Sequence, residues 1–105
     1  MIPDRGDVVL ISFEGAPGVE VIRRPALVVS PARYNSRSGL ALMCPIAQRA
    51  KGYPFEVSFP EGAPVSGVVL ADHLRSTDWR ARRAELVGQA PPGVVSDVLA
   101  KLKPI

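Results

Sequence analysis

Apolar positions along this chain occur in short runs that are separated by turn-forming residues, a pattern typical of β-strands. The runs predict strands over residues 7–13, 25–30, 40–46, 53–59 and 66–71, with a further strand over 81–87. Residues 14–23 include two glycines and a proline, so we expect an exposed loop there. Residues 34–39 have the composition of a turn, and residues 72–80 are expected to be irregular or to form a short helical turn.

The period changes after Pro91-Pro92-Gly93. Five apolar residues then recur at offsets of one, three or four, which predicts an amphipathic helix that ends at Pro104. They are Val94, Val95, Val98, Leu99 and Leu102. Several short strands followed by one helix predict a mainly β fold with α, in which a small bent barrel is closed on one side by the helix.

Length and composition narrow the possible classes of protein. A chain of 105 residues is expected to form a single domain over residues 1–105. No apolar run approaches the roughly 20 residues that a membrane span needs, and the N-terminus lacks the apolar core of a signal peptide, so we expect a cytoplasmic protein. The lone Cys44 lies in an apolar strand and excludes an intrachain disulfide. His73 is the single histidine, so we expect no metal or other cofactor and give His73 a structural or supporting role.

The net charge is only +3, but arginines cluster in two segments, over residues 23–51 and 75–83. Clustered arginines favour a polyanion or an acidic protein as partner, because their forked donors match phosphates and carboxylates. RNA carries its own nucleophile, the 2′-hydroxyl, so cleavage needs only a base, an acid and fixed positive charge at the phosphate. Arg24, where the loop meets the strand, can supply the charge, and Glu20, four residues earlier, is a possible base.

Several motifs, in this order and spacing, resemble those of the MazF/PemK toxins over most of the chain. They are Pro3-Asp4-Arg5-Gly6-Asp7, Arg24-Pro25-Ala26-Leu27-Val28-Val29-Ser30-Pro31, Tyr34-Asn35, Lys51-Gly52-Tyr53-Pro54-Phe55-Glu56-Val57 and Ala71-Asp72-His73-Leu74-Arg75-Ser76-Thr77-Asp78-Trp79-Arg80-Ala81-Arg82. The resemblance implies an SH3-like barrel with a C-terminal helix and a metal-independent, sequence-specific endoribonuclease. Such an enzyme cuts single-stranded RNA, leaves a 2′,3′-cyclic phosphate and a 5′-hydroxyl, and arrests growth by inhibiting translation. The resemblance also implies a homodimer and a cognate MazE-like antitoxin. Because basic residues cluster on this chain, we expect that antitoxin to have an acidic tail.

Arg24 matches the catalytic arginine of that family, and Glu20 is the candidate glutamate of the preceding loop. We expect RNA binding by Arg23, Gln48, Arg49, Lys51 and Tyr53, with the Tyr53 ring either stacking on a base or lying in the core. Phe55 is expected in the core, and Trp79 in the core or an interface.

Ala47 stands where the family has a threonine or serine that contacts the scissile phosphate. A lost hydrogen bond of about 1.5–3 kcal/mol predicts a slower nuclease. Two alternatives stay open. One is a CcdB-like poison that binds a protein such as gyrase. The other is a catalytically weak RNA-binding homologue.

Overall fold

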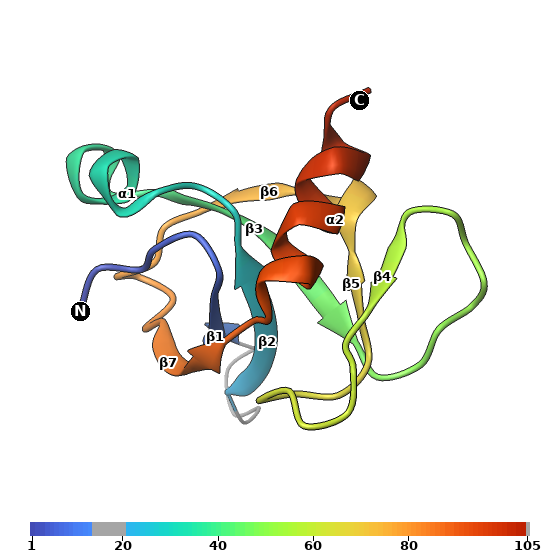
Figure 1. Cartoon of the computed structure of the whole chain (residues 1–105). Helices are drawn as coiled ribbons and strands as arrows, with labels where there is room; N and C mark the ends of the chain where they lie inside the picture. Colours follow the sequence, from blue (N-terminus) through green and yellow to red (C-terminus); the bar gives the residue numbers. More distant parts are fainter. Residues whose placement is uncertain (14–20, 105) are drawn as a thin grey trace.

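The computed structural model describes residues 1–13 and 21–104 (Figure 1). Its elements in chain order are β1 (Asp7–Phe13), β2 (Ile22–Val28), α1 (Ala32–Ser38), β3 (Ala41–Ala47), β4 (Glu56–Ser58), β5 (Val68–Leu70), the short 3-10 helix η1 (Ala71–His73), β6 (Arg75–Thr77), β7 (Glu85–Gln89) and α2 (Pro92–Leu102). Within the described residues, no helix is long and apolar enough to cross a membrane.

The strands form one antiparallel sheet in the order β4-β5-β3-β2-β1-β7, with β6 as a second partner of β3. Along the edge opposite β2, the first half of β3 pairs with β6 and its last two residues pair with β5. The helix η1 joins β5 to β6, so the chain turns sharply beside β3. The predicted mainly β fold with a C-terminal helix is confirmed, and the sheet with its turn at η1 is the frame of the site.

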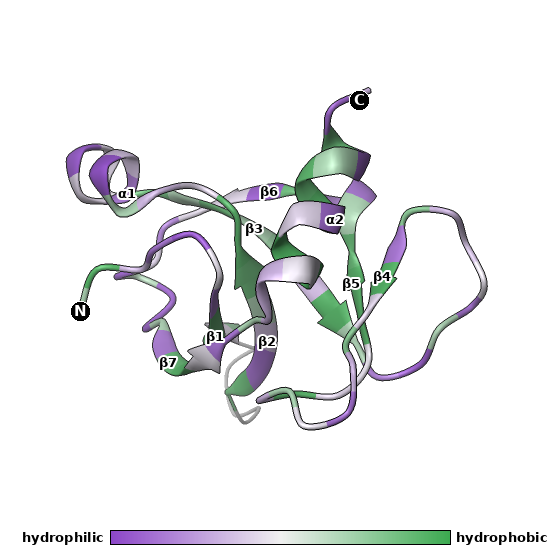
Figure 2. Cartoon of the chain, viewed as in Figure 1, coloured by the Kyte–Doolittle hydropathy of each residue, from purple (hydrophilic) through white to green (hydrophobic). Residues whose placement is uncertain are grey.

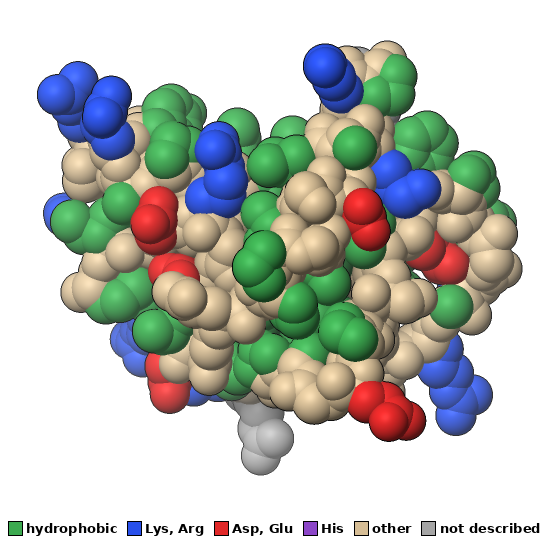
Figure 3. Space-filling model, viewed as in Figure 1, with side chains coloured by type: hydrophobic (Ala, Val, Ile, Leu, Met, Phe, Trp, Pro, Cys, Tyr) green, Lys and Arg blue, Asp and Glu red, His purple; other side chains and the backbone are tan. Residues whose placement is uncertain are grey.

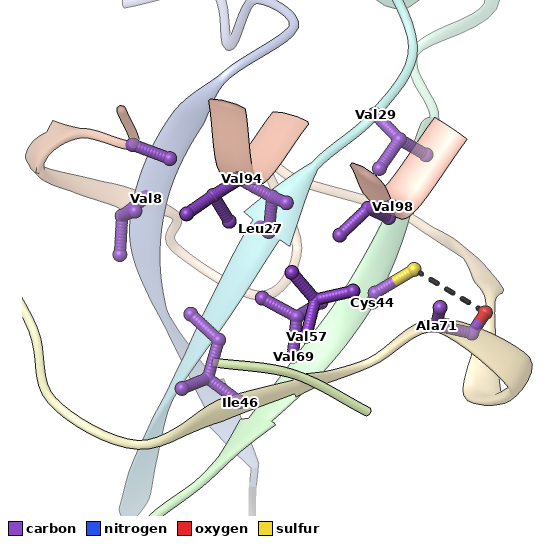
Figure 4. Close-up of a cluster of buried hydrophobic side chains, with 11 residues drawn as sticks. Val8, Leu27, Val29, Cys44, Ile46, Val57, Val69, Ala71, Val94 and Val98 are labelled. Atoms are coloured by element: carbon purple, nitrogen blue, oxygen red, sulfur yellow. Dashed lines mark hydrogen bonds between the residues drawn. The ribbon is translucent and has the colours of Figure 1, made fainter. Parts of the chain in front are cut away.

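Each face of the sheet has its own core, and apolar residues follow the strands through the middle of the molecule (Figure 2). On one face, Leu27, Val94 and Val98 bring α2 against the sheet (Figure 4). On the other face, Val9, Ala26, Val28 and Met43 pack against Trp79. Because side chains alternate along a strand, the two faces of β2 belong to two different cores, and Trp79 is a core residue, one of the two places predicted for it.

The segment over residues 34–39, which composition marks as a turn, is in fact most of helix α1. Its buried Asn35 explains the difference. The Asn35 side-chain amide donates to the carbonyls of Pro3 at 2.8 Å and Ser30 at 3.0 Å, and its oxygen accepts from the Ser30 hydroxyl. These tertiary hydrogen bonds, and not local helix propensity, account for the stability of this short helix. Gly39, at φ 73°, ends the helix.

Strand boundaries differ from prediction at several places. β2 begins at Ile22, earlier than predicted, because β1 provides a partner as far as Phe13. β4 is limited to Glu56–Ser58, so Tyr53 and Phe55 precede the strand that was predicted over residues 53–59. β7 starts at Glu85 because residues 78–84 form turns around buried Trp79, whereas β6 occupies part of the segment expected to be irregular.

Candidate active site

A cavity of about 910 Å³ opens on the sheet face opposite α2. Its floor is mostly apolar, and polar or basic residues stand around it. The lining consists of Ile11, Phe13, Ile22, Arg24, Pro25, Ala26, Met43, Pro45, Leu70, His73, Arg75, Ser76, Thr77, Asp78, Ala81 and Arg82. A concave, largely apolar site with a few convergent polar groups is the usual form of a binding site.

Strand register explains why Arg24 reaches this cavity and Arg23 does not line it. Arg24 pairs with Ile11 of β1 and shares the face of Ala26. Arg23 directly precedes Arg24 in the strand, so its side chain points to the other face. There its guanidinium lies 2.7 Å from the carboxylate of Glu85. Arg24 thus lies within a paired strand and not at the junction of loop and strand, and the pairing limits the movement of its backbone.

The cavity is electropositive. Arg24, Arg75, Arg82 and His73 line it, whereas Asp78 is the acidic residue of the described lining. The Asp78 carboxylate accepts the backbone N–H of Ala81 at 3.0 Å and so caps the local turn. A site rimmed by arginines over an apolar floor suits a phosphate with an attached base.

One wall of the cavity is a stacked pair. The Arg82 guanidinium lies 5.3 Å from the centre of the Phe13 ring. The Arg82 carbonyl also accepts the backbone N–H of Ser12 at 2.8 Å, so this wall is attached to β1. The cation–π contact keeps a guanidinium in place beside the cavity without using its donors on a carboxylate.

Ala47 is the last residue of β3 and lies on the same sheet face as Arg24. The register pairs Ala26 with Pro45, and two more residues in the same register would set Arg24 opposite Ala47. The Ala47 methyl group is therefore on the Arg24 face of the sheet, at the position where the family resemblance expects a hydroxyl. Two other hydroxyls, those of Ser76 and Thr77 on β6, line the cavity.

The residues after β3 form an exposed tip, defined here as residues 48–55. Gln48, Arg49 and Lys51 are exposed, and the Tyr53 side chain is 64% exposed, which rules out a place in the core for it. Phe55 is half-buried and belongs to neither core cluster, so its predicted place in the core is not confirmed. The tip emerges beside β4 and β5, and basic side chains stand at the rim of the α2 face, around the hydrophobic centre (Figures 1 and 3).

The predicted site residues are thus divided. Arg24 lines the cavity, whereas Arg23, Gln48, Arg49, Lys51 and Tyr53 are not among its lining residues. Glu20 falls outside the described residues. Six polar lining residues were missed as site residues by sequence reasoning: His73, Arg75, Ser76, Thr77, Asp78 and Arg82. The arginine cluster after residue 74 was the sequence signal for this part of the site. Only the pairing of β6 with β3 shows that these arginines line the same cavity as Arg24.

Two further groups bear on the chemistry. Among the described residues, no group of three His, Cys, Asp or Glu side chains is arranged to hold a metal ion. Cys44 is buried, and its thiol lies 3.7 Å from the Ala71 carbonyl (Figure 4). Burial, with a contribution from Asp72, raises the pKa of Cys44 to about 11, so this thiol is a core group and a poor nucleophile.

Comparison with known proteins identifies the family to which this site belongs. The family model described as "PemK-like, MazF-like toxin of type II toxin-antitoxin system" matches residues 4–105. The chain belongs to the MazF/PemK family. It is 40% identical over 102 residues to the endoribonuclease toxin MazF of Escherichia coli K12, with 96% of this chain and 91% of the relative covered. It is 38% identical over 109 residues to the endoribonuclease toxin ChpB of the same strain, with 97% and 92% covered.

The fold comparison agrees with the sequence comparison. A crystal structure of MazE-MazF from Deinococcus radiodurans matches with a TM-score of 0.92 and 52% identity, covering 99% of this chain and 95% of that chain. The MazF/PemK fold predicted from the motifs is therefore confirmed, and the chain is an endoribonuclease of this toxin family.

Proposed function

We propose that this MazF/PemK toxin cuts single-stranded RNA at specific sequences without a metal ion, and thereby inhibits translation and growth. The 2′-hydroxyl loses its proton, its oxygen bonds to the adjacent phosphorus, and the bond from phosphorus to the 5′-oxygen breaks. The 5′-oxygen takes up a proton, which leaves a 2′,3′-cyclic phosphate and a 5′-hydroxyl. The observation that carries this proposal is Arg24, fixed in a paired strand and lining a cavity with other basic groups.

Arg24 has the role of stabilising the charge that develops on the phosphorane. The sheet fixes the Arg24 backbone, and a cation that is already in place needs little reorganisation when that charge appears. Glu20 is proposed as the base, on the resemblance alone. His73 shares the cavity with Arg24, and an imidazole is the side chain that most often exchanges protons in catalysis, so we assign it to the leaving 5′-oxygen.

The exposed tip is proposed to hold the RNA strand outside the cavity. Arg49 and Lys51 offer charge for phosphates, and the exposed Tyr53 ring offers a face on which a base can stack. Gln48 follows Ala47 directly and is proposed to contact the RNA backbone near the cavity. Arg23 stays a predicted RNA ligand, although its ion pair with Glu85 turns it toward the other face.

The Arg24→Ala substitution tests the catalytic role. Loss of one donor to a developing oxyanion typically costs on the order of 10²–10³ in kcat. We expect that loss for single-turnover cleavage of a long mixed-sequence RNA in EDTA buffer. Arg33→Ala is the matched control, since it removes the same charge from exposed α1, away from the cavity. Parent-like cleavage by the Arg24 variant, or no difference between the variants, would show that Arg24 has no such role.

A second candidate function is RNA binding with very slow cleavage, and Ala47 is the observation that favours it. Rate separates the two functions, since both predict RNA binding. The second function would be established if the protein bound RNA but its cleavage rate in EDTA stayed at background at every enzyme concentration.

We also propose that an antitoxin with an acidic segment covers the cavity and excludes RNA. The structural relatives include a MazE-MazF complex, and the cavity of this chain has more basic than acidic lining residues. Attraction between opposite charges raises the association rate and is screened by salt. We expect a competition titration to show exclusive binding of RNA and antitoxin. Simultaneous binding of both would place the antitoxin elsewhere.

A homodimer completes the proposal. Apolar side chains remain exposed on β2 and β7, the two neighbours of β1, with Ile22 46% and Leu86 48% exposed. Twofold dimers are the commonest soluble oligomers and cover such surfaces. Light scattering should give a mass near twice 11.2 kDa. A monomer at micromolar concentration would contradict this assembly.

A further inference from the structure

The Glu56 carboxylate is surrounded by three successive backbone N–H groups of the exposed tip. It accepts from Lys51 at 2.9 and 3.1 Å, from Gly52 at 2.9 Å and from Tyr53 at 3.2 Å. Successive N–H groups that converge in this way form an anion-binding concavity. Here the anion is the first residue of β4, so the tip closes back on its own strand.

The tip is attached at two more points. The Lys101 ammonium, from α2, donates to the Pro54 carbonyl at 2.6 Å, and the Glu56 backbone N–H donates to the Tyr53 carbonyl at 3.2 Å. Gly52 has a φ of +83°, a conformation that side-chain-bearing residues rarely adopt. The backbone from Lys51 to Pro54 is therefore held by the sheet and by the C-terminal helix, although its side chains are exposed.

Glu56 places a negative charge beside the tip that is proposed to bind RNA, itself a polyanion, so the presence of this carboxylate needs a physical reason. As a free charge, Glu56 would repel phosphates and weaken RNA binding. As an acceptor for three N–H groups, it fixes the conformation that presents Lys51 and Tyr53 outward. Ordering a flexible segment costs about 1–2 kcal/mol per residue, so a tip ordered before binding gains affinity.

We infer that Glu56 is a positioning residue for RNA binding. It acts by ordering the tip so that Lys51 and Tyr53 contact the RNA. This inference rests on the proposed function of the chain. The N–H groups, that of Lys51 foremost, also lower the pKa of Glu56 from its usual value, as donors to the ionised carboxylate do. The positive charge of Lys51 adds to this effect.

The sign of one affinity change tests the inference. The probe is a short, fluorescein-labelled, mixed-sequence single strand with 2′-O-methyl groups, which cannot be cut because it lacks the nucleophile. Loss of a negative charge alone would strengthen binding, whereas loss of an ordered tip weakens it. We expect Glu56→Ala to raise Kd about tenfold. Glu56→Gln, which keeps one acceptor, should give a smaller increase.

Glu61→Ala is the matched control. Glu61 is an exposed glutamate on the turn between β4 and β5, so this variant removes the same charge without the described contacts of the tip. It should leave Kd unchanged or slightly lower. Thermal unfolding of all variants checks that the fold is intact, and single-turnover cleavage at saturating enzyme should stay within about threefold of the parent, since Arg24 is untouched.

A double-mutant cycle identifies the route of the effect. In a Tyr53→Ala background, Glu56→Ala should lose most of its effect on Kd, because the ring that it positions is gone. An unchanged or lower Kd for Glu56→Ala, or full additivity with Tyr53→Ala, would overturn the inference. Failure of the parent protein itself to bind the probe would instead overturn the proposed function.

Discussion

Gly67 lies close against the end of β3, and its replacement is the sharpest test of the local geometry. A Cβ added to Gly67 would lie 2.1 Å from the carbonyl oxygen of Ala47, 3.1 Å from its carbonyl carbon and 3.2 Å from the Gln48 Cα. Ordinary contact begins at 3.4 Å, so Gly67→Ala requires the two backbones to separate by 3.4 minus 2.1, or about 1.3 Å. Backbone atoms cannot swing aside as the end of a long side chain can, so the strand end itself must move.

Two costs add at this position. Overpacking costs about 1–3 kcal/mol, and the φ of +110° at Gly67 strains any other residue by about 1–3 kcal/mol. The free energy of unfolding should fall by about 2–6 kcal/mol, and Tm by on the order of 10–40 °C, in a domain of this size.

Gly62→Ala separates the two costs. Gly62 lies in the same connection between β4 and β5 and has a φ of +84°, but a Cβ at this position would meet no neighbouring atom within 4 Å. It therefore carries the strain without the collision. Urea unfolding should show Gly67→Ala to be less stable than Gly62→Ala by about 1–3 kcal/mol. Equal stability of the two variants would refute the close approach of Gly67 to Ala47.

The remaining predictions concern four other residues. Ala47→Thr should raise single-turnover cleavage about 10–100-fold if its hydroxyl contributes about 1.5–3 kcal/mol, and an unchanged rate would remove Ala47 as the cause of slow cleavage. Backbone N–H groups, that of Lys51 foremost, lower the pKa of Glu56, so the carboxylate should hold the tip to a more acidic pH than an unperturbed glutamate would; in an NMR titration the Gly52 amide should shift at a lower pH than that at which free glutamate titrates, and a shift at the same or a higher pH would contradict it. Val98→Ala should cost about 2–3 kcal/mol in urea unfolding, because Val98 is 0% exposed, whereas a loss under about 1 kcal/mol would mean loose packing. Cys44 should react with N-ethylmaleimide at pH 8 only after unfolding, since burial raises its pKa to about 11, and rapid labelling of the native protein would contradict its burial.

Much of the fold could be predicted because its signals are local. β1 is largely apolar, β3 is a continuous apolar run, and the apolar stripe from Val94 to Leu102 describes α2 well. The errors have tertiary causes. Helix α1 depends on bonds from Asn35 to the distant Pro3 carbonyl, and β2 extends to Ile22 because β1 is there to pair with it. No pattern within either segment contains that information.

The site could be predicted only in part for the same reason. The motif around Arg24 indicates its role, and the structure places it on a cavity. The contribution of Arg75, Arg82 and His73 depends on β6 lying beside β3, a pairing between residues more than thirty positions apart. Glu56 belongs to a motif of the sequence, but its hold on the tip becomes visible only as hydrogen bonds to three successive residues.

Mapping both new ends of cleaved RNA tests the central claim most directly. The purified protein is incubated with a long mixed-sequence RNA in EDTA, and the products are probed for 5′-hydroxyl and 2′,3′-cyclic phosphate ends in parallel with Arg24→Ala. Attack by the 2′-hydroxyl predicts both kinds of end at recurrent short sequences, and a loss of on the order of 10²–10³ in rate with the variant. Ends with a 5′-phosphate and a 3′-hydroxyl, or cleavage that needs added metal, would contradict it.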